Sequence, residues 1–171
     1  MRLGCLDKGS NSERVARRVV NSRDLIISFR DMQEVFDSLK NGMVDYAVVP
    51  VENSITGEIH YKLEVERFGF TKVGEHIIDI RHCLASKSKD IGFILSHPEA
   101  LKQCRKYLER FSQVYIGETG STAEAARFIV DKKGNGAAIA DYQTCVDYGL
   151  NIIEGDIVKN NRSLFWIVKN G

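Results

Sequence analysis

Short apolar runs alternate with helix-patterned stretches along the whole chain, and this alternation restricts the fold more than any other feature. The run Arg2–Leu6 has the length of a strand, and residues 12–20 then repeat apolar side chains at helical spacing. Strands that alternate with helices predict an α/β fold with largely parallel sheets. A chain of 171 residues is long enough for one substantial core or for two small lobes.

The apolar pattern also predicts the bounds of single elements. A strand is expected at residues 46–49, where Pro50 ends the run. A helical stretch is expected at residues 57–67, and Asn41-Gly42 offers a C-terminal stop to the helix before it. Residues 73–84 alternate over an unusual length, which indicates a strand or strand pair that crosses a lobe boundary.

Charge and composition exclude several classes of protein. Lys and Arg total 24 and Asp and Glu total 23, a net charge of +1, so no nucleic-acid or membrane partner is implied. The N-terminal residues contain no apolar segment of signal-peptide length, and we expect a cytoplasmic protein. The four cysteines are widely spaced and fit neither a metal motif nor a disulfide scaffold: Cys5, Cys83, Cys104 and Cys145.

Polar side chains follow several predicted strands at the edge where an open parallel sheet places its ligands. They are Ser10, Ser12, Glu52, Asn53, Ser54, Thr56, Ser96, His97, Ser121 and Thr122. Hydroxyl and amide groups at helix starts favour a bound anion, above all a carboxylate. Taken singly, each hydroxyl is explained as an ordinary helix cap, and Ser121 with Glu124 has the spacing of a capping box.

Three further residues have both a functional and a structural interpretation. His97 is either a catalyst or a hydrogen-bonded corner residue. His82 beside Cys83 suggests a metal ligand, but no second ligand pair has the required spacing. Glu52 is the best-placed carboxylate for acid–base work, and a cap or salt bridge explains it as well.

Five segments, spread in order along nearly the whole chain, read D-Y-A-V-V-P-V-E-N-S-I-T-G (45–57), S-H-P-E-A-L-K-Q-C (96–104), G-S-T-A-E-A-A (120–126), A-A-I-A (137–140) and Y-G-L (148–150). Taken together, they resemble the prephenate dehydratase family. Two weaker matches are G-S-N-S-E (9–13) and H-C-L (82–84).

The resemblance implies a two-lobed fold like that of type II periplasmic binding proteins, with the active site in the interlobe cleft. Residues 1–75 and 157–171 are expected to form the first lobe, and residues 76–156 the second. The family converts prephenate to phenylpyruvate with loss of water and carbon dioxide, without a metal or organic cofactor. A small dicarboxylate substrate, a homodimer or homotetramer and the absence of a phenylalanine-binding ACT domain are the matching expectations for this chain.

The resemblance also assigns roles to individual residues. Catalytic roles are expected for Ser163, Asn53 and Ser54. Substrate-binding roles are expected for Ser121, Thr122, Ala123, Arg162, Phe165, Glu52 and Ser12. Ser96, His97 and Gln103 belong to a matched segment and are expected to shape its corner.

One departure from the family pattern affects the last predicted strand. Aligned on Asn161 and Phe165, the family motif Thr-Arg-Phe becomes Ser163-Leu164-Phe165. Serine can replace a threonine hydroxyl, whereas leucine cannot replace a guanidinium. Arg162 is expected on the same strand face as Leu164, where its side chain offers a substitute charge.

This departure leaves three hypotheses for the function. The first is a dehydratase-like lyase acting on prephenate. The second is a non-aromatising prephenate decarboxylase, because the Ser-Leu-Phe triplet resembles the bacilysin-type enzymes. The third is a non-catalytic sensor of an aromatic-pathway acid.

Overall fold

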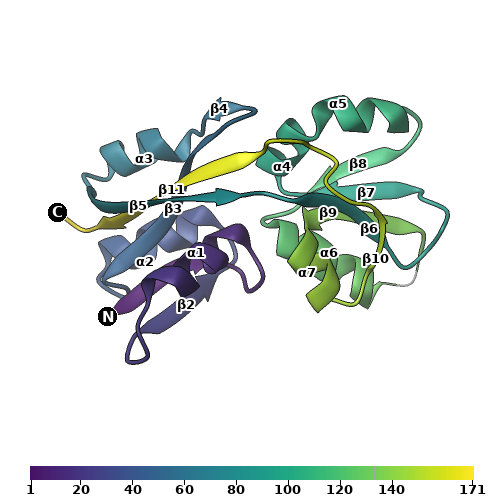
Figure 1. Cartoon of the computed structure of the whole chain (residues 1–171). Coiled ribbons are helices and arrows are strands. Elements are labelled where there is room, and N and C mark those ends of the chain that lie inside the picture. The colour runs from purple at the N-terminus through teal and green to yellow at the C-terminus, as the bar shows by residue number, and fades with distance from the viewer. Residues whose placement is uncertain (133) are drawn as a thin grey trace. The chain divides into compact units, whose positions relative to one another are not determined.

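The computed structural model describes residues 1–132 and 134–171 and divides the chain into two units (Figure 1). Unit 1 comprises Met1–Asp79 and Arg162–Gly171, and unit 2 comprises Ile80–Asn161. Each unit contains one sheet with helices packed on it, as expected for an α/β chain. The resemblance implied lobe boundaries after residues 75 and 156, and in the structure the strand that leaves unit 1 continues to Asp79.

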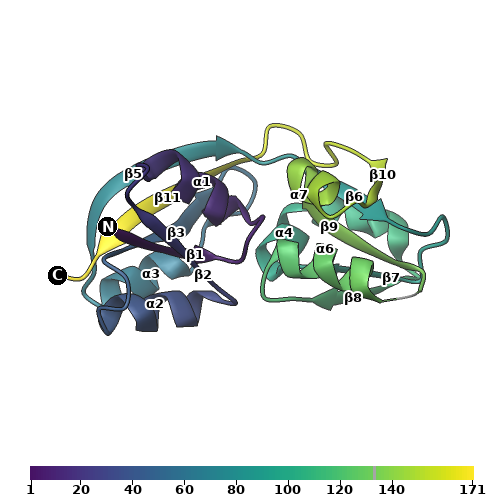
Figure 2. The same cartoon turned by 90° about the horizontal axis from the view of Figure 1, so that it is seen from below.

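The sheet of unit 1 has the strand order β2-β1-β3-β11-β5, and the short β4 pairs with β3. Its strands are β1 (Arg2–Leu6), β2 (Leu25–Phe29), β3 (Tyr46–Asn53), β4 (Gly57–Glu58), β5 (Thr71–Asp79) and β11 (Arg162–Lys169). Its helices are α1 (Asn11–Val19), α2 (Met32–Lys40) and α3 (Tyr61–Arg67). Helix α1 lies on one face of the sheet and helices α2 and α3 on the other (Figure 2).

Part of the core of unit 1 lies on the face that α2 and α3 cover. Met32, Val35, Phe36 and Leu39 recur at helical spacing along α2 and are nearly inaccessible to solvent. Helix α2 starts at the cap Asp31, whose carboxylate accepts the amide of Glu34. It ends before Gly42, whose φ of 69° belongs to the left-handed region. The predicted stop at Asn41-Gly42 is therefore confirmed.

The sheet of unit 2 has the strand order β10-β6-β9-β7-β8. Its strands are β6 (His82–Ser86), β7 (Phe93–Ser96), β8 (Tyr115–Glu118), β9 (Gly136–Asp141) and β10 (Asn151–Glu154). Its helices are α4 (Pro98–Gln103), α5 (Arg105–Leu108), the 3₁₀ turn η1 (Glu109–Phe111), α6 (Thr122–Asp131) and α7 (Tyr142–Asp147). Apolar side chains of α6 and α7 pack on one face of the sheet, and those of α4 and α5 on the other.

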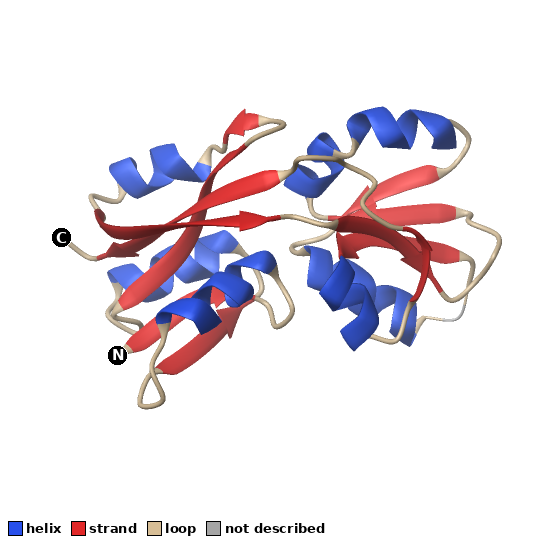
Figure 3. Cartoon of the chain, viewed as in Figure 1, coloured by secondary structure: helices blue, strands red, loops and turns tan. Residues whose placement is uncertain are grey.

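The expectation of largely parallel sheets was wrong for both units (Figure 3). Strand β11 runs antiparallel to both of its neighbours, β3 and β5, and β6 runs antiparallel to β9 and β10. The chain leaves unit 1 through β5 and re-enters it through β11, and this return places the two strands antiparallel. The parallel pairs are β1 with β2 and β3, and β7 with β8 and β9.

Two predicted element bounds also need correction. Strand β3 does not end at Pro50 but continues to Asn53. Opposite it, the register moves from Glu52 to Pro50 between Leu164 and Phe165, so Val51 is the extra residue of a β-bulge. A bulge tolerates the missing amide of proline inside a strand. The stretch 57–67 is not one helix, because β4 occupies its start and α3 begins only at Tyr61.

Candidate active site

The hydroxyl of Ser163 lies where the end of β3 meets the start of β11. Ser163 pairs with Asn53 in the register of the two strands, and both side chains are buried. The Nδ2 of Asn53 donates to the Oγ of Ser163 at 2.9 Å and to the carbonyl of Arg162 at 3.0 Å. Two of the three residues expected to be catalytic are therefore in direct contact.

The orientation of the Asn53 amide is fixed by the loop that follows it. Its Oδ1 accepts the backbone amides of Ile55 at 2.9 Å and Thr56 at 3.3 Å. Backbone amides only donate, so oxygen must occupy that position and the NH₂ group must face Ser163. Since Nδ2 has no acceptor capacity, the Ser163 oxygen accepts this bond and its own proton is directed elsewhere. The pair presents a hydroxyl that is poised to donate.

Ser54, the third residue expected to be catalytic, ties the loop to the start of β11. Its backbone amide donates to the carbonyl of Arg162, and its Oγ accepts the amide of Arg162, both at 2.9 Å. These contacts hold the backbone on the N-terminal side of Ser163. Ser54 itself is exposed.

Leu164 and Glu52 lie on the face of the sheet opposite the Ser163 hydroxyl. They pair with each other in the register, and Leu164 packs on the core cluster formed with α2 and α3. Arg162 alternates with Ser163 and is exposed, and its Nε donates to Asp79 at 3.1 Å. Phe165, also expected to bind substrate, is 3% exposed.

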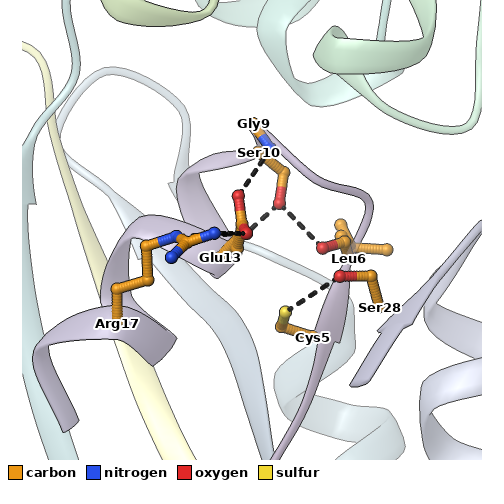
Figure 4. A network of polar contacts seen from close by, with 7 residues as sticks. All are labelled: Cys5, Leu6, Gly9, Ser10, Glu13, Arg17 and Ser28. Carbon is orange, nitrogen blue, oxygen red and sulfur yellow. Dashed lines mark hydrogen bonds and ion pairs between the residues drawn. The ribbon is translucent and has the colours of Figure 1, made fainter. Parts of the chain in front are cut away.

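The start of α1 is closed by its own side chains (Figure 4). The Oγ of Ser10 accepts the amide of Glu13 at 3.1 Å and donates to the carbonyl of Leu6. The buried Glu13 carboxylate accepts the amide of Gly9 at 2.6 Å and pairs with Arg17. These contacts form a capping box, as those of Ser121 and Glu124 do at the start of α6.

Ser12, expected to contact substrate, joins β1 to α1. Its Oγ accepts the amide of Leu6 at 3.1 Å, and the residue is 2% exposed. On β1, the thiol of Cys5 lies 4.0 Å from the hydroxyl of Ser28 on the neighbouring strand β2 (Figure 4). Burial raises the pKa of this thiol to about 12.

In unit 2, the predicted capping box at the start of α6 is confirmed. The Oγ of Ser121 accepts the amide of Glu124 at 2.9 Å, and the Glu124 carboxylate accepts the amide of Gly120 at 2.7 Å. Thr122 and Ala123 follow as the first helical residues, where backbone amides have no acceptor within the helix. These two amides and the helix dipole favour a carboxylate.

The two histidines singled out from the sequence differ in role. His97 caps α4, because its Nδ1 accepts the amide of Glu99 at 3.1 Å, and this supports the corner interpretation. His82 is buried and contacts Gln103, a partner that its neighbourhood in the sequence did not indicate. Within residues 1–132 and 134–171, no group of three His, Cys, Asp or Glu side chains is arranged to hold a metal ion.

None of the helices in the described part of the chain reaches the length and hydrophobicity that a bilayer crossing requires.

Comparison with known families gives a match over nearly the whole chain. The family model described as prephenate dehydratase matches residues 4–171. The chain belongs to the prephenate dehydratase family. It is 31% identical over 169 residues to the prephenate dehydratase of Lactococcus lactis, covering 94% of this chain and 60% of that protein. It is 30% identical over 155 residues to the chloroplastic arogenate dehydratase/prephenate dehydratase 2 of Arabidopsis thaliana, covering 88% of this chain and 40% of that protein.

Solved structures support the same fold. A prephenate dehydratase from Arthrobacter aurescens, solved in complex with L-Phe, superposes with a TM-score of 0.79 at 22% identity, over all of this chain and 61% of that one. A periplasmic substrate-binding protein of an ABC transporter from Coxiella burnetii gives a TM-score of 0.56 at 17% identity, over 99% of this chain and 84% of that one. The expected similarity of fold to periplasmic binding proteins is therefore confirmed.

Proposed function

We propose that this chain converts prephenate to phenylpyruvate, with loss of water and carbon dioxide. Membership of the prephenate dehydratase family supports this reaction class. The observation that carries the proposal is the contact in which Asn53 donates to the buried Ser163 oxygen at 2.9 Å. That contact leaves the serine proton available to a second oxygen.

The chemistry of prephenate needs such a donor. The ring C–O bond breaks and its electron pair leaves with the hydroxyl group, which gains a proton and departs as water. The electron pair of the C–CO₂⁻ bond moves into the ring, which becomes aromatic as carbon dioxide leaves. A hydroxyl that donates to the departing oxygen stabilises the charge that develops there. We assign this role to Ser163, with Asn53 as the residue that directs its proton.

Carboxylate recognition is the second requirement, because prephenate carries two carboxylates. We assign one of them to the backbone amides of Thr122 and Ala123 at the start of α6. A helix N-terminus favours an anion through its unpaired amides and its dipole. The capping contact of Ser121 keeps that helix start in place.

Arogenate is a second candidate substrate, because the Arabidopsis relative is named for both activities. It has the same ring and leaving hydroxyl as prephenate, with an amino group in place of the side-chain keto group. Both substrates therefore make the same demand on Ser163.

The test is product analysis after incubation of the purified protein with prephenate and, separately, with arogenate. We expect phenylpyruvate from prephenate, seen by its alkaline absorbance and by mass spectrometry. Ser163→Ala should lower turnover by about two to four orders of magnitude, whereas Ser22→Ala, at an exposed serine of the same unit, should not. A product that keeps the ring hydroxyl identifies the decarboxylase instead. Thermal stabilisation by prephenate without turnover identifies a sensor.

A further inference from the structure

Three buried polar side chains of unit 2 form a hydrogen-bonded chain outside the contact of Asn53 with Ser163. His82 at the start of β6, Gln103 at the end of α4 and Asn161 are 2%, 8% and 3% exposed. The His82 Nε2 lies 2.7 Å from the Oε1 of Gln103, and the Asn161 Nδ2 donates to the same oxygen at 2.9 Å. Gln103 thereby joins a strand, a helix and the segment before β11.

The other ring nitrogen of His82 decides the direction of these bonds. Its Nδ1 is buried and has no hydrogen-bond partner among the described residues. An unprotonated nitrogen in that place costs less free energy than an N–H group, because a buried donor without an acceptor is rare in folded proteins. The proton therefore resides on Nε2, which donates to Gln103.

His82 is held in this neutral form by its surroundings. Complete burial lowers the pKa of the imidazole below its ordinary value, and the bond to Gln103 and the charge of Asp141 oppose that effect only in part. A neutral ring with a fixed tautomer is a permanent single donor. It fixes which end of the Gln103 amide faces Asn161.

Asn161 is the last residue before β11, and both its side chain and its backbone are hydrogen-bonded. Its side chain bonds Gln103, and its carbonyl accepts the amide of Ile80 at 2.9 Å. Asn160, just before it, adopts a left-handed conformation with a φ of 54°, so the chain turns sharply into the strand. Arg162 and Ser163 follow directly, and the position of Asn161 therefore sets where β11 begins.

We propose that His82 is a positioning residue for the Ser163 hydroxyl, acting through the amide of Gln103 and the anchored side chain of Asn161. The kinetic part of this inference rests on the proposed function. The structural part concerns how rigidly residues 160–161, which precede β11, are held. It applies whatever reaction takes place at Ser163. In this proposal His82 and Gln103 act without touching the substrate.

Two substitutions of His82 distinguish the effect of its hydrogen-bond donor from the effect of the space that its ring fills. His82→Leu fills the space without a donor, and His82→Gln places an NH₂ group near the position of Nε2. We expect His82→Leu to lower kcat about ten- to a hundredfold with KM within about threefold, because small misplacements of a reacting group have effects of this size. His82→Gln should stay within about threefold of the wild type, as should the control His60→Gln at an exposed histidine.

A double-mutant cycle tests the route of the effect. If His82 acts through Gln103, the combination of His82→Leu with Gln103→Leu lowers kcat no further than the more damaging single change. Additive losses overturn the proposal, and so does a His82→Gln variant as slow as His82→Leu. Unchanged kcat in folded His82→Leu overturns it as well.

Two measurements do not depend on turnover. The ¹⁵N spectrum of the wild-type chain should show a neutral His82 protonated on Nε2, and protonation on Nδ1 overturns the proposed order of donors. Hydrogen exchange should rise in His82→Leu for a peptide covering residues 161–165 but not for one covering Leu25–Phe29 of β2. A rise in both peptides, or in neither, overturns the proposal. If wild-type protein turns over neither substrate, the proposed function fails, while these two measurements still decide the role of His82.

Discussion

Replacing Asn53 by aspartate inverts the hydrogen bond that directs the Ser163 proton. The change is nearly isosteric and keeps an oxygen that accepts the amides of Ile55 and Thr56. It removes both donors of Nδ2, those to the Ser163 Oγ and to the Arg162 carbonyl. A carboxylate in this place accepts the serine proton, so the hydroxyl no longer donates to a leaving oxygen.

The size of the effect follows from the contacts that are lost. Two neutral hydrogen bonds contribute about 0.5–1.5 kcal/mol each to the free energy of unfolding, so Asn53→Asp should lower it by about 1–3 kcal/mol. In Asn53→Asp, a carboxylate oxygen takes the place of Nδ2, about 3 Å from the Arg162 carbonyl oxygen, and two acceptors then face each other where water has little access. This unsatisfied contact lowers the free energy of unfolding further. Loss of a positioned proton donor lowers kcat about 10²- to 10⁴-fold, which corresponds to about 3–5 kcal/mol of transition-state stabilisation.

The assay is the steady-state formation of phenylpyruvate, with thermal unfolding to show that the variant is folded. The control Asn151→Asp changes charge by the same unit at an exposed residue of unit 2 and should leave kcat within about threefold. A folded Asn53→Asp variant with kcat within about tenfold of the wild type refutes the reasoning. The direction of the Ser163 proton is then irrelevant to the chemistry.

Three further predictions concern other parts of the chain. Leu164→Arg should leave kcat/KM within about threefold, because position 164 lies on the face opposite the Ser163 hydroxyl; a tenfold gain in steady-state assays contradicts this placement. His82, whose pKa is lowered by burial, should make the free energy of unfolding fall as the pH drops below about 6.5, since the unfolded chain binds the additional proton. Denaturant titrations at several pH values between about 5 and 8 give the free energy of unfolding at each pH. This free energy should depend less on pH in His82→Gln than in the wild type, and an equal pH dependence excludes His82 as its source. Three buried thiols should resist alkylation by iodoacetamide in the native state and react after unfolding, because burial raises their pKa to about 12. Mass spectrometry measures the labelling, and fast labelling of the native protein contradicts this prediction. These thiols are Cys5, Cys104 and Cys145.

Local signals in the sequence predicted the elements well where neighbours in the chain decide the structure. The capping box at Ser121 and Glu124 and the helix stop at Gly42 depend on residues within one turn of each other. The contacts of His82 are of another kind. Gln103 lies 21 residues away from it, and Asn161 lies 58 residues beyond Gln103. No spacing rule connects such positions, so the buried chain of polar groups appears only once the sheet is assembled.

The β-bulge at Val51 decides which residue faces the Ser163 hydroxyl. Without it, pairing of Phe165 with Pro50 would continue to Glu52 opposite Ser163, since strand partners advance one residue at a time. A carboxylate there would accept the serine proton, which is the arrangement that Asn53→Asp creates. The extra residue shifts the register by one position, so that the Asn53 amide meets Ser163 and Glu52 meets Leu164 on the other face. In the family motif the position of Leu164 carries an arginine, and in this register that residue pairs with Glu52 across the strands rather than with the hydroxyl. In this chain the pair is Leu164 with Glu52 on the α3 side of the sheet, while the Asn53 amide donates to the Ser163 hydroxyl on the other face.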